Sequence, residues 1–168
     1  MPSFKEKRLV PYTPQQMYQL VADVKAYPEF VPWCKALDVT KESHKAIEAQ
    51  MTLVLASYET TFASCVVLTP HERIEIKNAT PQNDEDIGPL RSLESVWTFR
   101  PCKDGQCEIV FSITAELRNS LLHPFLAMAM DKAGDEMVKA FEERAANCYS
   151  QTKKNDLTKN VSHGEPSS

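Results

Sequence analysis

Residues 26–39 read AYPEFVPWCKALDV, and this stretch decides how the chain folds. Two prolines fix the backbone here while three large side chains, Tyr27, Phe30 and Trp33, crowd into a short segment. A helical pattern precedes the stretch and an alternating pattern follows it. We therefore predict that residues 27–34, named the corner below, turn the chain sharply from a first helix into a sheet.

The helix before the corner is marked by its first residues. Thr13 can cap a helix, Pro14 suits the first helical position, and Gln16 stands where a capping box requires an amide or an acid. Apolar residues then recur at helical spacing: Met17, Leu20, Val21 and Val24. We predict a helix that begins at Pro14 and leads directly into the corner.

Beyond the corner the apolar pattern becomes alternating and stays so to about residue 117, which is typical of strands with one covered face. Strands are predicted within residues 4–11, 47–55, 62–68, 73–77, 93–99 and 107–117. Residues 103–106, KDGQ, suit a hairpin turn between the last two strands. These segments predict an antiparallel sheet of about six or seven strands.

Helical periodicity returns after Arg118 and continues to about Ser150. Near its start this helix carries a second apolar stripe, formed by Leu121, Phe125 and Met128. Three interpretations stay open: the corner covers the stripe, the stripe and corner form the mouth of a cavity, or the stripe rests on a membrane or partner. Residues 151–168 are polar without apolar periodicity, so we predict one domain, residues 1–150, followed by a disordered tail.

The composition narrows the functional classes. The 168 residues are 42% hydrophobic, and the formal net charge of −4 argues against general binding to DNA. Five scattered cysteines show neither zinc-site nor secreted disulfide spacing, and no apolar run reaches the ~20 residues that span a bilayer. No nucleophile elbow, phosphate loop or metal-ligand spacing is present. We therefore expect no catalytic residues, no metal and no enzymatic reaction.

Several motifs carry a resemblance to a known family. They are VPYT at 10–13, QMY at 16–18, LVADV at 20–24, YPEFVPWC at 27–34, LESVWTF at 93–99 and SLLH at 120–123. In this order they resemble the coenzyme Q-binding proteins of the polyketide cyclase and START-like superfamily. The resemblance implies an α+β helix-grip fold, in which a curved antiparallel sheet surrounds a long C-terminal helix with an apolar tunnel between them.

The resemblance also implies a function. Residues 1–150 would be a START-like coenzyme Q-binding domain that holds ubiquinone or its isoprenoid intermediates without catalysis and supports respiratory electron transport and quinone biosynthesis. The quinone is then a bound ligand and no cofactor is needed. The expected location is the bacterial cytoplasm or inner-membrane periphery, in peripheral membrane contact, or the matrix side of the mitochondrial inner membrane in a eukaryote.

Two alternatives stay open. The same superfamily includes bacterial ribosome-association toxins, which would bind the large ribosomal subunit, inhibit translation initiation and present a basic face. It also includes cyclases and aromatases, which would need ionisable groups inside the tunnel. The sequence places apolar or small residues at the inward positions of its clearest strands.

The tunnel lining is predicted from large apolar residues at inward positions. For each of them, ordinary core packing is the alternative role. The predicted lining residues are Phe30, Val31, Trp33, Leu53, Leu55, Phe62, Trp97, Phe99, Phe111, Leu122, Phe125, Leu126 and Met130.

Overall fold

The computed structural model describes residues 2–55, 58–79, 90–119, 121 and 123–161. The helical elements are α1 (Pro14–Ala22), η1 (Val24–Ala26), α2 (Tyr27–Phe30), η2 (Lys103–Gly105) and α3 (His123–Val161). The strands are β1 (Ser3–Val10), β2 (Cys34–Glu42), β3 (Ala46–Leu55), β4 (Tyr58–Thr69), β5 (Arg73–Ala79), β6 (Leu90–Pro101) and β7 (Cys107–Leu117).

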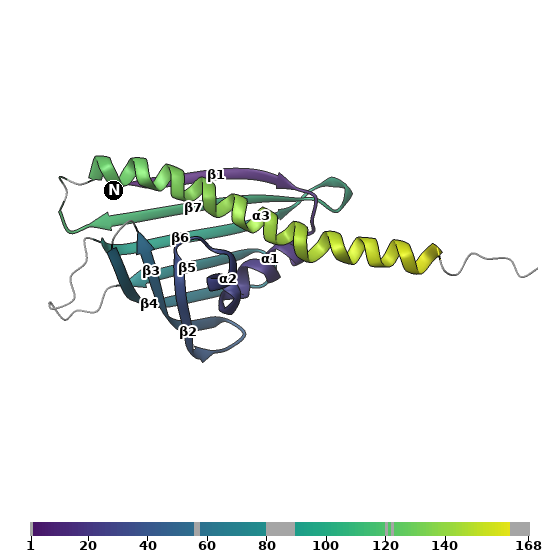
Figure 1. Ribbon diagram of the computed structural model, residues 1–168, viewed down its shortest axis with the longest axis horizontal. Coiled ribbons are helices and arrows are strands. Elements are labelled where there is room, and N and C mark those ends of the chain that lie inside the picture. The colour runs from purple at the N-terminus through teal and green to yellow at the C-terminus, as the bar shows by residue number, and fades with distance from the viewer. Residues whose placement is uncertain (1, 56–57, 80–89, 120, 122, 162–168) are drawn as a thin grey trace, which may run out of the picture.

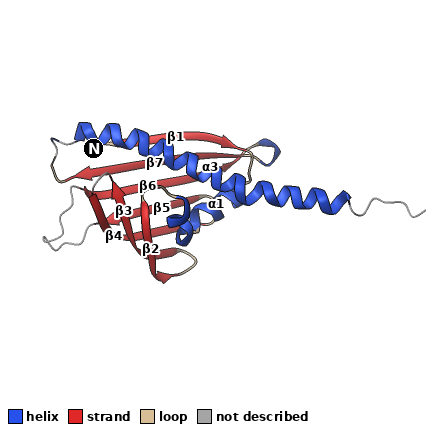
Figure 2. Cartoon of the chain, in the orientation of Figure 1, coloured by secondary structure: helices blue, strands red, loops and turns tan. Residues whose placement is uncertain are grey.

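Within the described ranges, seven strands form one antiparallel sheet in the order β1-β7-β6-β5-β4-β3-β2. The chain's first strand lies beside its last, with Ser3 opposite Thr114. The sheet curves, and α3 runs obliquely across one of its faces (Figures 1 and 2). The predicted α+β helix-grip fold, with six or seven strands around a long C-terminal helix, is confirmed.

The core lies between the sheet and α3. Side chains of β7 alternate strictly between buried and half-buried, as a strand with one covered face requires. At the centre, the Trp97 ring lies 4.4 Å from the Phe111 ring and 4.8 Å from the Phe141 ring, measured between centroids. These three side chains are almost fully buried, so the aromatic cluster fixes α3 to β6 and β7.

The first helix begins as predicted. The Thr13 hydroxyl accepts a hydrogen bond from the Gln16 backbone N–H at 3.1 Å, and the Gln16 side chain accepts one from the Thr13 N–H at 3.0 Å. This capping box satisfies two backbone donors that the helix itself leaves without partners. The Tyr149 hydroxyl donates to the Gln16 carbonyl at 2.6 Å and ties α1 to α3.

The corner turns the chain as predicted, but the residue that it packs against disagrees with two of the three interpretations of the second stripe. The Tyr27 and Phe30 rings pack edge-on against Phe141, with centroids 5.5 and 5.0 Å away. Phe141 lies 16 residues beyond Phe125 in the same helix, a separation of about 24 Å. The corner therefore does not cover the second stripe, and the two do not form one gate.

The helix α3 approaches the edge strand β1 closely. A Cβ atom added to Gly134 would lie 2.3 Å from the nearest ring atom of Phe4, which is too close for any side chain without movement. Glycine therefore allows α3 to lie directly on the Phe4 ring. The ring in turn covers Phe111 from the edge of the sheet, with 6.3 Å between ring centroids.

The helix is also longer than predicted. Residues 151–161 continue α3 beyond the sheet, where the sequence predicted a disordered tail (Figure 1). The division into a domain and a tail at residue 150 stays a prediction. No glycine or proline occurs between Asp135 and His163, and polar residues without an apolar face still propagate a helix that has already formed. Residues 162–168 lie outside the described part of the chain.

Candidate ligand site between the sheet and the long helix

A small cavity lies between the inner face of the sheet, the corner and α3. Its volume is about 30 Å³, which is room for one or two water molecules. Pockets that hold organic ligands are about 300–1,000 Å³, so a larger ligand enters only if lining side chains move. The lining residues are Tyr27, Val31, Trp33, Cys34, Met51, Leu53, Ile76, Asn78, Leu93, Ser95, Ile113 and Met137.

Three neighbouring strands carry buried polar side chains at or beside this cavity, and two of these side chains, Asn78 and Ser95, line it. Ser64 on β4, Asn78 on β5 and Ser95 on β6 are buried on the inner face of the sheet. Ser64 and Asn78 stand directly opposite each other in the antiparallel register. We name these three residues the polar triad.

Two oxygen atoms of the polar triad lack a hydrogen-bond partner among the described residues: Ser64 Oγ and Asn78 Oδ1. The Asn78 amide nitrogen donates to the Met51 sulfur at 3.9 Å, and a thioether is a weak acceptor. A buried polar group without a partner costs about 1–3 kcal/mol. The ligand-free interior is therefore less stable than an all-apolar interior of the same shape.

The ionisable groups that line the described cavity wall are held neutral. Burial raises the pKa of the Tyr27 hydroxyl far above its usual range, and that hydroxyl donates a hydrogen bond to the Val21 carbonyl. Burial also raises the pKa of the Cys34 thiol to about 11. At neutral pH the wall of the cavity carries no charge, which suits an uncharged ligand.

The buried thiols predict a dependence of stability on pH. Burial raises the pKa of both Cys34 and Cys107 to about 11, whereas an unfolded cysteine has a pKa near ~8.5. Because the folded pKa is the higher one, this stabilising contribution is complete below about pH 8.5 and is lost as the pH rises towards 11. Urea denaturation should show a falling free energy of unfolding over that range.

A variant with alanine at both buried cysteines provides the control for this pH dependence, and its decline should be smaller. A thiol reagent at pH 8 should modify the exposed Cys65 and Cys148 quickly and reach Cys34 and Cys107 only on unfolding. Equal modification rates at all four thiols would contradict the burial that underlies the prediction.

Eleven of the thirteen predicted lining residues fall into three groups. Val31, Trp33 and Leu53 line the cavity. A second group is buried in the core without lining it: Phe62, Trp97, Phe99, Phe111 and Met130. The side chains of a third group lie outside what the structure describes: Leu55, Leu122 and Leu126. Contact of any of these residues with a ligand stays a prediction.

The two remaining predicted positions do not line this cavity, and their contact with a ligand likewise stays a prediction. Phe30 is partly buried and packs on Phe141, while the Arg144 guanidinium lies 5.2 Å from the centre of its ring. Phe125 is 72% exposed, so it lies on the surface of α3 and does not line the interior. A helical stripe in a sequence shows which residues share a face, but it does not show what that face contacts.

The polar triad and Met51, Ile76 and Met137 were not among the predicted site residues. The alternating pattern contains the signal for Asn78, because the buried Ile74 and Ile76 precede it at spacings of four and two residues. An asparagine at the next inward position is the unusual feature. Such an asparagine is noticed in the sequence only if the polar residues at inward strand positions are considered together with the apolar ones.

Three large apolar side chains are exposed at the N-terminal end of α3, two of them on the helix and one, Leu121, two residues before it. Leu121 is 80% exposed, Phe125 72% and Met128 76%. We name these three residues the apolar patch. Among the described residues, no helix combines the length and apolar character required to cross a membrane, and no group of three metal-ligating side chains is present.

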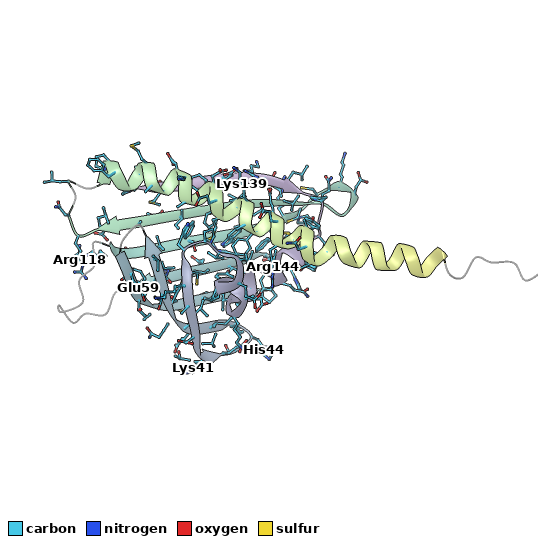
Figure 3. All side chains as sticks on the ribbon, viewed as in Figure 1. Lys41, His44, Glu59, Arg118, Lys139 and Arg144 are labelled. Carbon is cyan, nitrogen blue, oxygen red and sulfur yellow. The ribbon has the colours of Figure 1, made fainter. Side chains whose placement is uncertain are left out.

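Several cations on the described surface lie beside carboxylates. Lys25 contacts Glu42 at 2.8 Å, and Arg144 contacts Glu29 at 3.0 Å. Other such ion pairs are Lys7–Glu108, Lys35–Glu59, Arg73–Glu75 and Lys139–Asp135. Of the cations labelled in Figure 3, Lys139 and Arg144 lie on α3, Lys41 lies on β2, and Arg118 follows β7. Positive and negative charges are therefore mixed over this surface.

Known proteins share this sequence and fold. The family model described as polyketide cyclase / dehydrase and lipid transport matches residues 10–142. The ribosome association toxin RatA of Pseudomonas aeruginosa is 35% identical over 141 residues, which are 84% of this chain and 93% of that protein. The mitochondrial coenzyme Q-binding protein COQ10 homolog B of Xenopus laevis is 29% identical over 150 residues, which are 87% of this chain and 59% of that protein.

The solved structures support the same fold. A START superfamily protein from Mycobacterium smegmatis has a TM-score of 0.72 at 14% identity, covering 86% of this chain and 97% of that one. At this identity the likeness concerns the fold alone. The family model, in contrast, matches more than half of the sequence, from the strand before α1 to the middle of α3. The chain belongs to the polyketide cyclase / dehydrase and lipid transport family.

Proposed function

We propose that this protein binds ubiquinone or a related isoprenoid quinone between its sheet and α3 and carries it without catalysing a reaction. The observation that carries the proposal is the cavity, whose lining is mainly apolar and holds its ionisable groups neutral. A long isoprenoid tail gains about 25 cal/mol for each Å² of apolar surface that it buries, so affinity needs no charged site.

Binding requires the interior to open. The cavity of about 30 Å³ is much smaller than a quinone ring, and Trp33, Leu93 and Met137 are the lining side chains that are only partly buried. Met137 is unbranched and adapts readily to a new neighbour. Movement of these side chains between the corner and α3 would widen the cavity without separating the sheet.

The proposed carrier meets its ligand at a membrane. The apolar patch would rest on the lipid surface, which agrees with the third interpretation of the second stripe. The protein would then work at the periphery of a bacterial inner membrane, or on the matrix side of the mitochondrial inner membrane. The mitochondrial relative from Xenopus laevis supports the second of these locations.

Extraction of the purified protein tests the proposal. Protein from a quinone-producing host should yield about one quinone per chain when the organic extract is analysed by mass spectrometry. Leu93→Trp would fill the cavity and should lose most of this quinone. Val96→Trp, on the same strand but facing outward, should keep it. A wild-type protein without quinone, cosedimenting with large ribosomal subunits, would overturn the proposal.

The second candidate function is association with the large ribosomal subunit, as in a toxin that inhibits translation. It is favoured by the Pseudomonas aeruginosa relative, whose name states ribosome association, because its identity to this chain is higher and the match covers more of its own length. The mixed surface charges argue against it, because a partner rich in phosphate favours unpaired cations. Sedimentation with purified ribosomal subunits at low and physiological salt distinguishes the two candidates.

A further inference from the structure

We propose that the polar triad of Ser64, Asn78 and Ser95 binds the polar ring of the ligand, so that the ring lies innermost in the cavity. This inference rests on the proposed function and deepens it. The strongest observation is that Ser64 Oγ and Asn78 Oδ1 are buried without a hydrogen-bond partner. Buried polar atoms in folded proteins almost always have a hydrogen-bond partner. We therefore expect a polar group of the ligand to form these hydrogen bonds.

The register holds the three side chains close together on one face. Ser64 and Asn78 are direct neighbours across β4 and β5, where opposite Cβ atoms lie about 4.5–5.5 Å apart. Ser95 pairs with Ile76, two residues before Asn78 on the same strand, and is therefore a diagonal neighbour of Asn78. Asn78 and Ser95 both line the cavity, so polar groups on two adjacent strands face the same space.

The chemistry of these groups selects the class of ligand. An amide and two hydroxyls each offer a donor and an acceptor, and none of them is charged. A carboxylate, phosphate or ammonium group would need a counter-ion, but the ionisable lining residues Tyr27 and Cys34 stay neutral. A neutral ring bearing carbonyl or hydroxyl groups, as in a benzoquinone or its quinol, fits this arrangement.

The present contact of the amide is easily exchanged. Asn78 Nδ2 lies 3.9 Å from the Met51 sulfur, a weaker acceptor than a carbonyl oxygen. A quinone carbonyl would accept a stronger hydrogen bond from the same nitrogen. A quinol hydroxyl could instead donate to Asn78 Oδ1. The triad therefore recognises the ring, while the apolar wall contacts the tail.

Two probes separate recognition of the ring from burial of the tail. The first is ubiquinone with a short isoprenoid tail, and the second is an isoprenoid hydrocarbon of the same length without the ring. Asn78→Leu in the full chain should weaken binding of the quinone about tenfold or more, which corresponds to about 1.4 kcal/mol. Its affinity for the hydrocarbon should not fall, and the ligand-free variant should melt at the same or a higher temperature.

Two further variants complete the experiment. Ser64→Ala is the milder change and should weaken quinone binding in the same direction, which keeps the test decisive if Asn78→Leu fails to fold. Lys77→Leu, exposed on the outer face of the same strand, should leave both affinities unchanged.

The outcomes separate this inference from the proposed function. If both triad variants bind the quinone as tightly as wild type does, the triad holds only internal water and the inference is overturned, while the carrier function stands. If the wild-type protein binds neither probe, the carrier function itself fails, and the inference fails with it.

Discussion

Replacing Phe141 by alanine should lower the free energy of unfolding by about 3–5 kcal/mol. Its side chain is 1% exposed and packs against the rings of Tyr27, Phe30 and Trp97. The substitution removes a ring that contacts both the corner and the centre of the sheet. A cavity would remain, because the surrounding strands are held in register and cannot close around it.

The same helix offers a matched control. Phe125→Ala makes the same chemical change on α3, but this side chain is 72% exposed and should alter the free energy of unfolding by less than about 0.5 kcal/mol. Urea denaturation followed by circular dichroism measures both variants. Similar losses in the two variants would show that α3 does not cross the sheet as described.

Replacing all three residues of the apolar patch by serine should weaken binding to lipid vesicles by about 100-fold or more. Burying one large apolar side chain contributes roughly 1.5–3 kcal/mol, and a hundredfold change in affinity corresponds to about 2.7 kcal/mol. The estimate therefore holds even if the patch enters the lipid only partly. Flotation with vesicles of phosphatidylethanolamine and phosphatidylglycerol measures the change, and the variant should keep its wild-type melting temperature.

Exposed apolar residues elsewhere provide the control for this variant. Leu9, Val54 and Val67 are 60%, 36% and 41% exposed and lie on strands of the sheet. Serine at these three positions removes a similar number of exposed apolar side chains and should leave flotation unchanged. If both triple variants lose binding equally, the protein contacts lipid through general hydrophobicity and not through α3.

The sequence predicted best those features that depend only on residues close to one another in the chain. The capping box at Thr13 and Gln16 depends on residues three apart, and it forms as predicted. The alternation along β7 likewise follows from the geometry of a single strand, and the hairpin turn at 103–106 forms where it was expected. Each of these features can be recognised without knowing what the segment contacts.

The strand β2 was not predicted, because its pairing with β3 is irregular. Its pairing with β3 shifts register between Cys34 and Ala36 and again between Val39 and Lys41. Each irregularity moves the following side chains to the other face, so the alternation that marks a strand is lost. The strand also lies at an edge of the sheet, where polar residues are tolerated on both faces.

The candidate site required the three-dimensional structure. The corner contains three rings, but only the fold shows that Tyr27 and Phe30 meet Phe141 while Trp33 lines the cavity. The members of the polar triad come from three different strands. They are a candidate binding group only because the fold buries them next to one another. Distances between strands depend on the register, which no single segment of the sequence contains.

The pairing of β1 with β7 determines when the protein can finish folding. During synthesis β1 leaves the ribosome first, yet Ser3 pairs with Thr114 and Phe4 is covered by α3 at Gly134. Contacts so distant in sequence are slow to form. The nascent chain must therefore keep β1 unpaired until β7 and the first half of α3 have been translated, so this edge of the sheet forms late in folding.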